Sequence, residues 1–243
     1  MAYSTPILVR RVVLVLAAST LGCGSDLLLP EPADGGQNVA LSKVTGDEQV
    51  GTVGQPLPQP LVVQVLSERQ QPAAGRKVAF VLSADPAAGE VSPDTAVTDD
   101  EGRATARWVL GTAPGAHVVV AQLVGGEADN QVTEFRAAAM AAAPDTISAA
   151  SVLAQPGRRA REVGTAPVVR VVDHYGNPVE NASVVWQVTA GNGRVDQPLT
   201  STDGNGHATV HWTLGDRIGV HKLTATLGDV SGSPITFTAT VLF

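Results

Sequence analysis

The chain contains one stretch of sequence twice, and this duplication constrains the fold more than any other feature. TDDEGRATARWVLG begins at Thr98 and TDGNGHATVHWTLG begins at Thr202, so the two copies lie 104 residues apart. Each copy has an acidic turn with glycine, an alternating segment with a tryptophan near its end, and a final Leu-Gly. This spacing is about the length of one β-sandwich domain. The 243-residue chain is therefore predicted to contain two domains of the same fold.

Apolar and polar side chains alternate strictly within both copies. A period of two with one apolar face is typical of a strand in an antiparallel sheet that packs on one side and contacts water on the other. We therefore predict that Trp108 and Trp212 are core residues rather than a ligand platform. The apolar positions of the two copies are Ala104, Ala106, Trp108 and Leu110, and Ala208, Val210, Trp212 and Leu214.

The other strand-like segments of the sequence also recur in the same order in both halves, which predicts an all-β protein with two tandem sandwiches. Further core aromatic residues are expected at matching positions, namely Phe80 with Trp186 and Phe135 with Phe237. In the first copy, strands are expected at 39–44, 61–66, 78–82, 117–124 and 132–137, in addition to the Trp108 strand. The segment GDEQVGTVGQPLPQP is expected to be a connection, and Ala137–Asp145 a short connector between domains. The predicted domains are residues 39–140 and 145–243.

The first residues have the pattern of an export signal. Arg10 and Arg11 precede an apolar run, Val12 to Leu21, which is too short to span a bilayer comfortably and is followed by Gly22. Cys23 is the only cysteine, so no intrachain disulfide can form. Proline, glycine and acidic residues in GSDLLLPEPADGGQN are typical of a flexible tether. We therefore predict a signal over 1–22 and a tether over 23–38.

Composition and motifs argue against nucleic-acid binding and catalysis. Removing Arg10 and Arg11 with the signal leaves 14 of the 16 basic residues against 23 acidic ones, and no basic patch is evident along the sequence. The chain has no G-x-S-x-G, no H-E-x-x-H, no phosphate-binding loop and no paired-cysteine metal motif. We expect no enzyme activity and no cofactor.

Acidic and histidine residues are candidate metal ligands in this sequence, but a structural role is favoured for each. The oxygens of Asp99, Asp100 and Glu101, and of Asp203 with Asn205, suit Ca²⁺, but Asp or Asn before glycine also forms turns without metal. His207 and His211 are expected on one strand face about 13 Å apart, because a strand rises about 3.3 Å per residue, which is too far for one Zn²⁺. His117 and His221 share a repeat position and are expected to form a hydrogen bond to a neighbouring loop. No metal site is predicted.

Three segments carry a resemblance to a known family. TGDEQVGTVGQPLPQPLVVQV, DHYGNPVENASVVWQV and TDGNGHATVHWTLG resemble the bacterial immunoglobulin-like domains of invasins and intimins. The resemblance implies a Greek-key sandwich without disulfides, in tandem on a bacterial surface, that acts as a scaffold rather than a catalyst. At the start of the second domain, QPGRRAREVGTAP departs from the usual Gly-Gln turn of that family.

The segment TLGC, Thr20 to Cys23, resembles the lipobox of bacterial lipoproteins, with Thr20 where that family usually has leucine. The resemblance implies lipid attachment at Cys23, which becomes the mature N-terminus, and Gly24 in place of aspartate favours the outer membrane. A soluble secreted or periplasmic protein, cut near Ala17–Ser19, is the alternative. A structural or adhesive cell-surface module is expected, and a binding module for a polysaccharide or an envelope protein is the alternative. Among the aromatic residues, only Tyr175 is predicted to contact a ligand.

Overall fold

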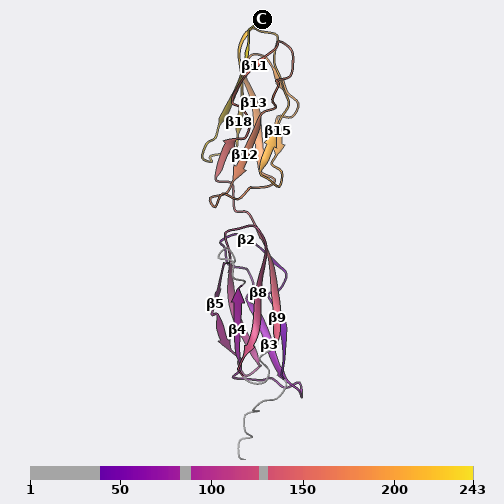
Figure 1. Ribbon diagram of the computed structural model, residues 1–243, viewed down its shortest axis with the longest axis vertical. Helices are drawn as coiled ribbons and strands as arrows, with labels where there is room; N and C mark the ends of the chain where they lie inside the picture. The colour runs from indigo at the N-terminus through magenta and orange to yellow at the C-terminus, as the bar shows by residue number, and fades with distance from the viewer. Residues whose placement is uncertain (1–38, 83–88, 126–130, 243) are drawn as a thin grey trace, which may run out of the picture. The chain divides into compact units, whose positions relative to one another are not determined.

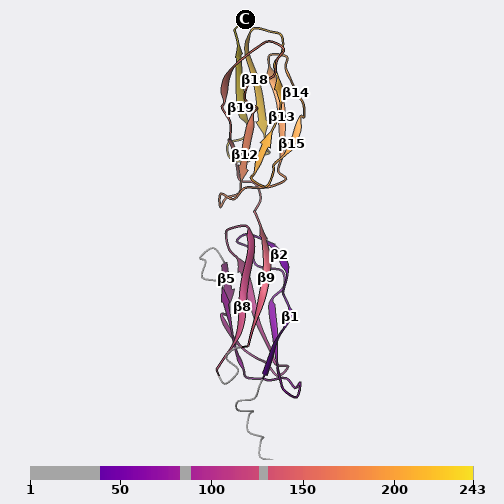
Figure 2. The ribbon, with the colours of Figure 1, turned by 45° about the vertical axis from the view of Figure 1, so that its right-hand side comes forward.

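The computed structural model describes residues 39–82, 89–125 and 131–242, and all regular secondary structure in them is β-strand. The predicted signal, tether and Cys23 lie outside the described residues. Figures 1 and 2 show the strands β1–β9 grouped in one sandwich and the strands β10–β19 in another. Each sandwich has its own cluster of buried apolar side chains, over 39–139 and 147–241 respectively. The all-β, tandem-sandwich prediction is confirmed.

The first sandwich consists of a four-stranded and a five-stranded sheet. The four-stranded sheet is antiparallel and has the order β1 (Val39–Thr45), β3 (Leu61–Ser67), β7 (Arg103–Leu110) and β5 (Gly89–Ser92). The other sheet has the order β2 (Gln49–Thr52), β9 (Val132–Met140), β8 (Gly115–Val124), β4 (Lys77–Leu82) and β6 (Thr95–Val97). Its edge strand β2 runs parallel to β9.

The second sandwich repeats this arrangement, although several of its strands are shorter. Its five-stranded sheet has the order β11 (Ala154–Gly157), β19 (Ile235–Val241), β18 (Gly219–Thr226), β13 (Ser183–Ala190) and β15 (Leu199–Ser201). β11 runs parallel to β19, just as β2 runs parallel to β9. The facing strands are β10 (Thr146–Ala149), β12 (Val168–Val172) and β16 (His207–Thr209), with a separate pair β14 (Arg194–Val195) and β17 (Trp212–Thr213).

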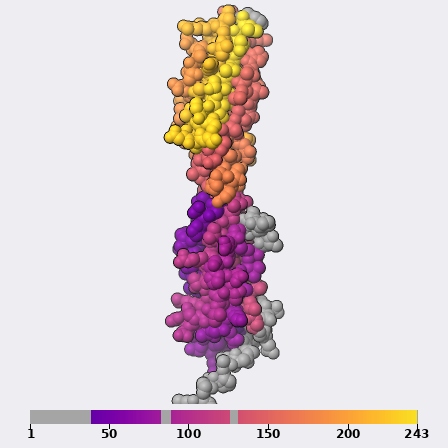
Figure 3. Space-filling view, turned by 90° about the vertical axis from the view of Figure 1, so that its left-hand side faces the viewer, coloured from indigo at the N-terminus to yellow at the C-terminus, as the bar shows by residue number. Residues whose placement is uncertain are grey.

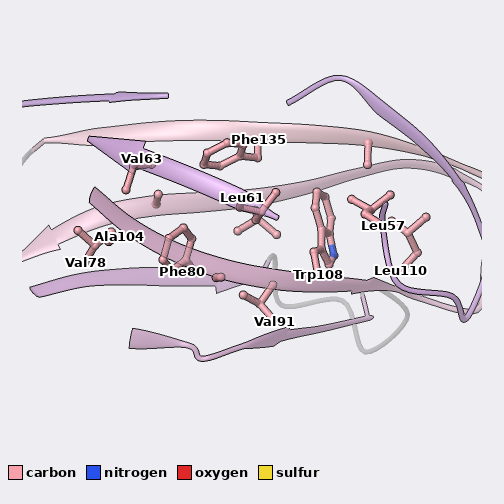
Figure 4. Packing of buried hydrophobic residues seen from close by; sticks show 14 of the residues in the cluster. Leu57, Leu61, Val63, Val78, Phe80, Val91, Ala104, Trp108, Leu110 and Phe135 are labelled. Carbon is pink, nitrogen blue, oxygen red and sulfur yellow. The ribbon is translucent and has the colours of Figure 1, made fainter. Parts of the chain in front are cut away.

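Aromatic side chains from both sheets fill the two cores. In the first sandwich, Trp108, Phe80 and Phe135 are 1%, 3% and 0% exposed, and Figure 4 shows them among aliphatic side chains. In the second, Trp186, Trp212 and Phe237 are at most 2% exposed, and the rings of Trp186 and Phe237 are 6.0 Å apart. Burial of this much apolar surface is the main stabilising contribution in a domain without disulfides.

The prediction that the last strand of the first sandwich ends at Ala137 is wrong. β9 continues to Met140, because its alternating alanines Ala137 and Ala139 face the core and are 4% and 6% exposed. Both residues also pair with β8 on one side and β2 on the other. Sheet pairing and burial therefore override the helix propensity of an alanine run.

The segment GDEQVGTVGQPLPQP is not a plain connection, because it contains the parallel edge strand β2. The Gln49 side chain holds the segment in place: its amide donates to the carbonyls of Gly46 and Gln59, and its oxygen accepts the amide of Gln59. Gln155 makes the equivalent pair of bonds with the backbone of Thr165 in the second sandwich. A side chain that closes a turn in this way stabilises a short strand that sequence alternation does not reveal.

The second tryptophan stretch is not one strand, contrary to expectation. β16 ends at Thr209, and β17 begins at Trp212 in a different pair. In the first sandwich Ala106 pairs with Leu61. Val210 is the equivalent of Ala106 in the second sandwich, and its partner there is Pro167. Proline has no N–H to donate, so one bond of the ladder is lost at this point. The break separates His207 on β16 from His211 before β17.

Candidate functional site

The acidic turns are held by their own side chains. Asp99 Oδ1 accepts the amides of Glu101 and Arg103 at 3.1 and 2.8 Å, and Asp203 Oδ1 accepts the amides of Asn205 and His207 at 2.9 and 2.8 Å. The bond from the His207 amide, together with that from Asn205, lowers the pKa of the Asp203 carboxyl. Among the described residues, no group of three or more His, Cys, Asp and Glu side chains is arranged to hold a metal ion. These bonds support the interpretation of both motifs as turns.

Each repeated stretch begins with a buried threonine whose role the sequence analysis did not identify. Thr98 Oγ1 donates to the carbonyl of Ala73 at 2.6 Å and accepts the amide of Arg76 at 2.9 Å. In the second sandwich, Thr202 Oγ1 makes the same two bonds with Val179 and Ala182. The signal was present in the sequence, since a hydroxyl recurs directly before the acidic turn in both copies.

His117 and His221 have matching structural environments. Each is buried, and its Nε2 atom lies 2.8 or 2.9 Å from a backbone carbonyl four residues earlier, that of Ala113 or Arg217. A hydrogen bond of this kind ties the loop to the strand that follows it. Both side chains therefore have a structural arrangement like the one expected from their shared repeat position.

His211 lies in an exposed ion pair rather than beside His207. Its Nδ1 contacts Glu162 Oε1, and its backbone amide donates to Asp196 Oδ1 at 3.0 Å. The hydrogen bond with Glu162, and then the charges of Glu162 and Asp196, raise the pKa of the His211 imidazole. His207 is half-buried on β16. The structure does not bring these two histidines into one site.

The loop that carries Tyr175 is organised around the carboxylate of Asp173, which is 2% exposed. Oδ1 accepts the amides of Tyr175 and Asn177, and Oδ2 accepts the Asn177 side chain and the amide of Ala142, all at 2.9–3.0 Å. Burial opposes ionisation of Asp173, but these four bonds outweigh it and lower the pKa. Tyr175 is 41% exposed, and its ring lies 3.7 Å from that of His174.

We expect Asp173→Asn to lower the free energy of unfolding by about 1–3 kcal/mol, because an amide cannot accept all four bonds. The folded-state pKa of Asp173 is lowered, so its contribution to stability is present above the unfolded pKa of about 3.9 and is lost as the pH falls through the folded value. Urea unfolding of wild type and variant, measured at neutral pH and in acid, checks both effects. Asp229→Asn, at an exposed position, is the control. Equal stability of the Asp173 variant and this control at neutral pH would contradict the prediction.

A loop rich in arginine joins β11 to β12 in the second sandwich. Four backbone hydrogen bonds fix its conformation. The amides of Ala160, Arg161, Val163 and Leu214 donate to the carbonyls of Gly215, Arg158, Trp212 and Arg161, respectively. Among the described residues, the guanidinium groups of Arg158 and Arg161 form no side-chain hydrogen bond or ion pair. No helix in the described part of the chain is long and apolar enough to cross a membrane.

Two solved structures of bacterial proteins share the fold of this chain. The solved structure of FdeC, an Escherichia coli adhesin, matches with a TM-score of 0.58 at 19% identity, over 87% of this chain and 66% of that one. The structure of Yersinia pseudotuberculosis InvD matches with a TM-score of 0.51 at 14% identity, over 84% and 57%. This chain therefore spans less than two thirds of the length of either structure. A comparison with curated protein sequences gives no match.

A protein-family model matches part of the second sandwich. The model of the bacterial Ig-like domain (group 1) matches residues 165–240, which cover most of the second sandwich from Thr165 to Thr240. The first sandwich repeats its sheet order, its parallel edge strand and its core tryptophan. The chain thus has the fold of tandem bacterial immunoglobulin-like domains, and its residues 165–240 match group 1 of that family.

Proposed function

We propose that this protein is a non-catalytic lipoprotein of the bacterial cell surface, whose two immunoglobulin-like sandwiches serve as a structural or adhesive module. The observation that carries the proposal is the fold: two sandwiches in tandem, similar in structure to an E. coli adhesin. The lone Cys23 after an apolar segment supports anchoring by lipid at the outer membrane. Lipoproteins of this type carry several acyl chains, and more than one chain is needed for stable anchoring.

A second candidate is a specific binding module for a polysaccharide or an envelope protein. A cavity in the second sandwich favours it, because small-ligand sites are concave and have a few convergent polar groups. Both candidates place the sandwiches outside the cytoplasm, and they differ in whether one defined ligand is recognised.

Metabolic labelling with a clickable palmitate analogue tests the anchor. We expect the wild-type chain to be labelled and to partition into detergent, and Cys23→Ser to lose both properties completely. The substitution removes the single thiol of the chain and leaves both cores unchanged, so the variant is also expected to unfold at the same urea concentration as wild type. Protease treatment of intact cells then tests whether the sandwiches are exposed at the surface.

Two results would contradict the lipoprotein proposal. Equal labelling of wild type and Cys23→Ser would mean that Cys23 is not the lipid attachment site. A mature N-terminus located after Cys23 would favour the alternative, a soluble secreted protein.

A further inference from the structure

The arginine loop of the second sandwich, residues 158–163, has a counterpart in the first sandwich that lacks the arginines. The amides of Gly54, Gln55 and Leu57 donate to the carbonyls of Gly111, Thr52 and Trp108, respectively. These bonds correspond to three of the four backbone bonds of the loop 158–163. The residues at the positions of Arg158, Arg159 and Arg161 are Thr52, Val53 and Gln55. One backbone conformation is therefore used twice, and the second copy alone carries three positive charges.

The central residue of the loop has an uncommon backbone conformation. Ala160 has a φ of 53°, whereas the first sandwich has Gly54 at this position with a φ of 71°. A left-handed conformation at alanine costs free energy that glycine avoids. The four backbone bonds of the loop hold Ala160 in this conformation, so Arg158 and Arg161 project from a fixed backbone turn.

Arg158 and Arg161 line a cavity of about 400 Å³. Pro156 and Leu242 give it apolar walls, and Glu162 and Thr240 add a carboxylate and a hydroxyl. Pro156 and Thr240 are adjacent because β11 pairs with β19, whose yellow segment lies on the surface in Figure 3. A cavity of this size is within the range of small-ligand sites.

The charges in the cavity favour an anionic group that also brings hydrogen-bond donors. The guanidinium groups of Arg158 and Arg161 have no acidic partner among the described residues, and a planar guanidinium binds a carboxylate with two parallel bonds. Glu162 is held beside them by His211, and its carboxylate accepts hydrogen bonds but repels a dense polyanion. The ligand must therefore offer both an isolated negative charge and hydroxyl or amide donors.

We propose that this cavity binds a uronate residue of an acidic polysaccharide. A uronate ring carries one carboxylate for the two arginines, hydroxyl groups for Glu162 and Thr240, and an apolar C–H face for Pro156 and Leu242. Nucleic acid fits less well, since its phosphates would approach Glu162, and none of the described residues that line the cavity is an aromatic residue for base stacking. The inference rests on the second candidate function, a binding module for a polysaccharide, and names its ligand class.

Binding of homogalacturonan oligomers to the purified chain, measured by calorimetry at physiological salt, tests the proposal. We expect Arg158→Ala/Arg161→Ala to weaken binding at least about tenfold, because each charged hydrogen bond contributes on the order of a tenfold factor. Arg159→Ala/Arg194→Ala is the matched control: it removes the same charge, and neither residue lines the cavity. We expect the control to change affinity less than about threefold, which is the scale of exposed charge effects. Arg158→Lys/Arg161→Lys keeps the positive charges but not the planar guanidinium groups that form two parallel bonds with a carboxylate, so it should give an intermediate loss of affinity.

Several outcomes would overturn the inference. Equal weakening by the two alanine pairs would indicate diffuse attraction between charges rather than a site. Equal binding of methyl-esterified homogalacturonan would exclude the carboxylate as the recognised group, and equal binding of polyglutamate would assign the cavity to an acidic peptide. Absence of binding to homogalacturonan would also overturn it, but would leave the lipid anchor untouched, since palmitate labelling at Cys23 is measured independently.

Discussion

Replacing Trp212 with alanine is expected to lower the free energy of unfolding of the second sandwich by about 3–5 kcal/mol. The indole is 0% exposed and packs in a core that includes Trp186 and Phe237. A domain of this size is stable by only about 5–15 kcal/mol, so the loss is a large part of the total. Trp212→Phe is expected to cost much less, because it keeps most of the buried apolar area and removes the indole Nε1, which has no partner among the described atoms.

Residue-resolved hydrogen exchange is the measurement that assigns the effect to one sandwich. Protection of core amides such as those of Val184 and Leu223 should fall in Trp212→Ala, while that of Val63 should not change. Trp108→Ala should show the reverse distribution, since Trp108 belongs to the other core. Unchanged protection of Val184 in Trp212→Ala would mean that the indole does not stabilise its own sandwich.

Patterns of period two in the sequence predicted the interiors of the sandwiches well. The inward residues of β7 alternate with exposed ones over its whole length, and Trp108 is buried as its position in the alternation implies. The same rule failed for the second copy after Thr209, because the strand partner of Val210 is Pro167, which has no N–H. Strand continuity depends on the neighbouring strand, and a single-strand pattern does not contain that information.

The edge strands and the arginine cavity depend on pairings between distant residues. β2 and β11 are only four residues long, and each pairs in parallel with the last strand of its sandwich. The sequence revealed QPGRRAREVGTAP as a departure from the family turn, but not that Thr240 and Leu242 would lie beside it. That juxtaposition follows from the register of β11 on β19, in which Pro156 is opposite Thr240. Short strands have too few residues for alternation to reveal such a register.

Thr202→Val is expected to destabilise the second sandwich by about 2–4 kcal/mol, although the side chain keeps its shape. Thr202 is 2% exposed, and its hydroxyl donates to the carbonyl of Val179 at 2.6 Å while it accepts the amide of Ala182 at 2.8 Å. Valine fills the same space but leaves both backbone groups buried without this partner, which costs more than the bonds contribute when formed. Urea unfolding measures the loss, and Thr202→Ser should recover most of it because the hydroxyl is retained. Thr209→Val, at an exposed position of β16, is the control and should change stability by less than about 0.5 kcal/mol. If Thr202→Val and Thr209→Val unfold at the same urea concentration, the hydroxyl does not hold the turn.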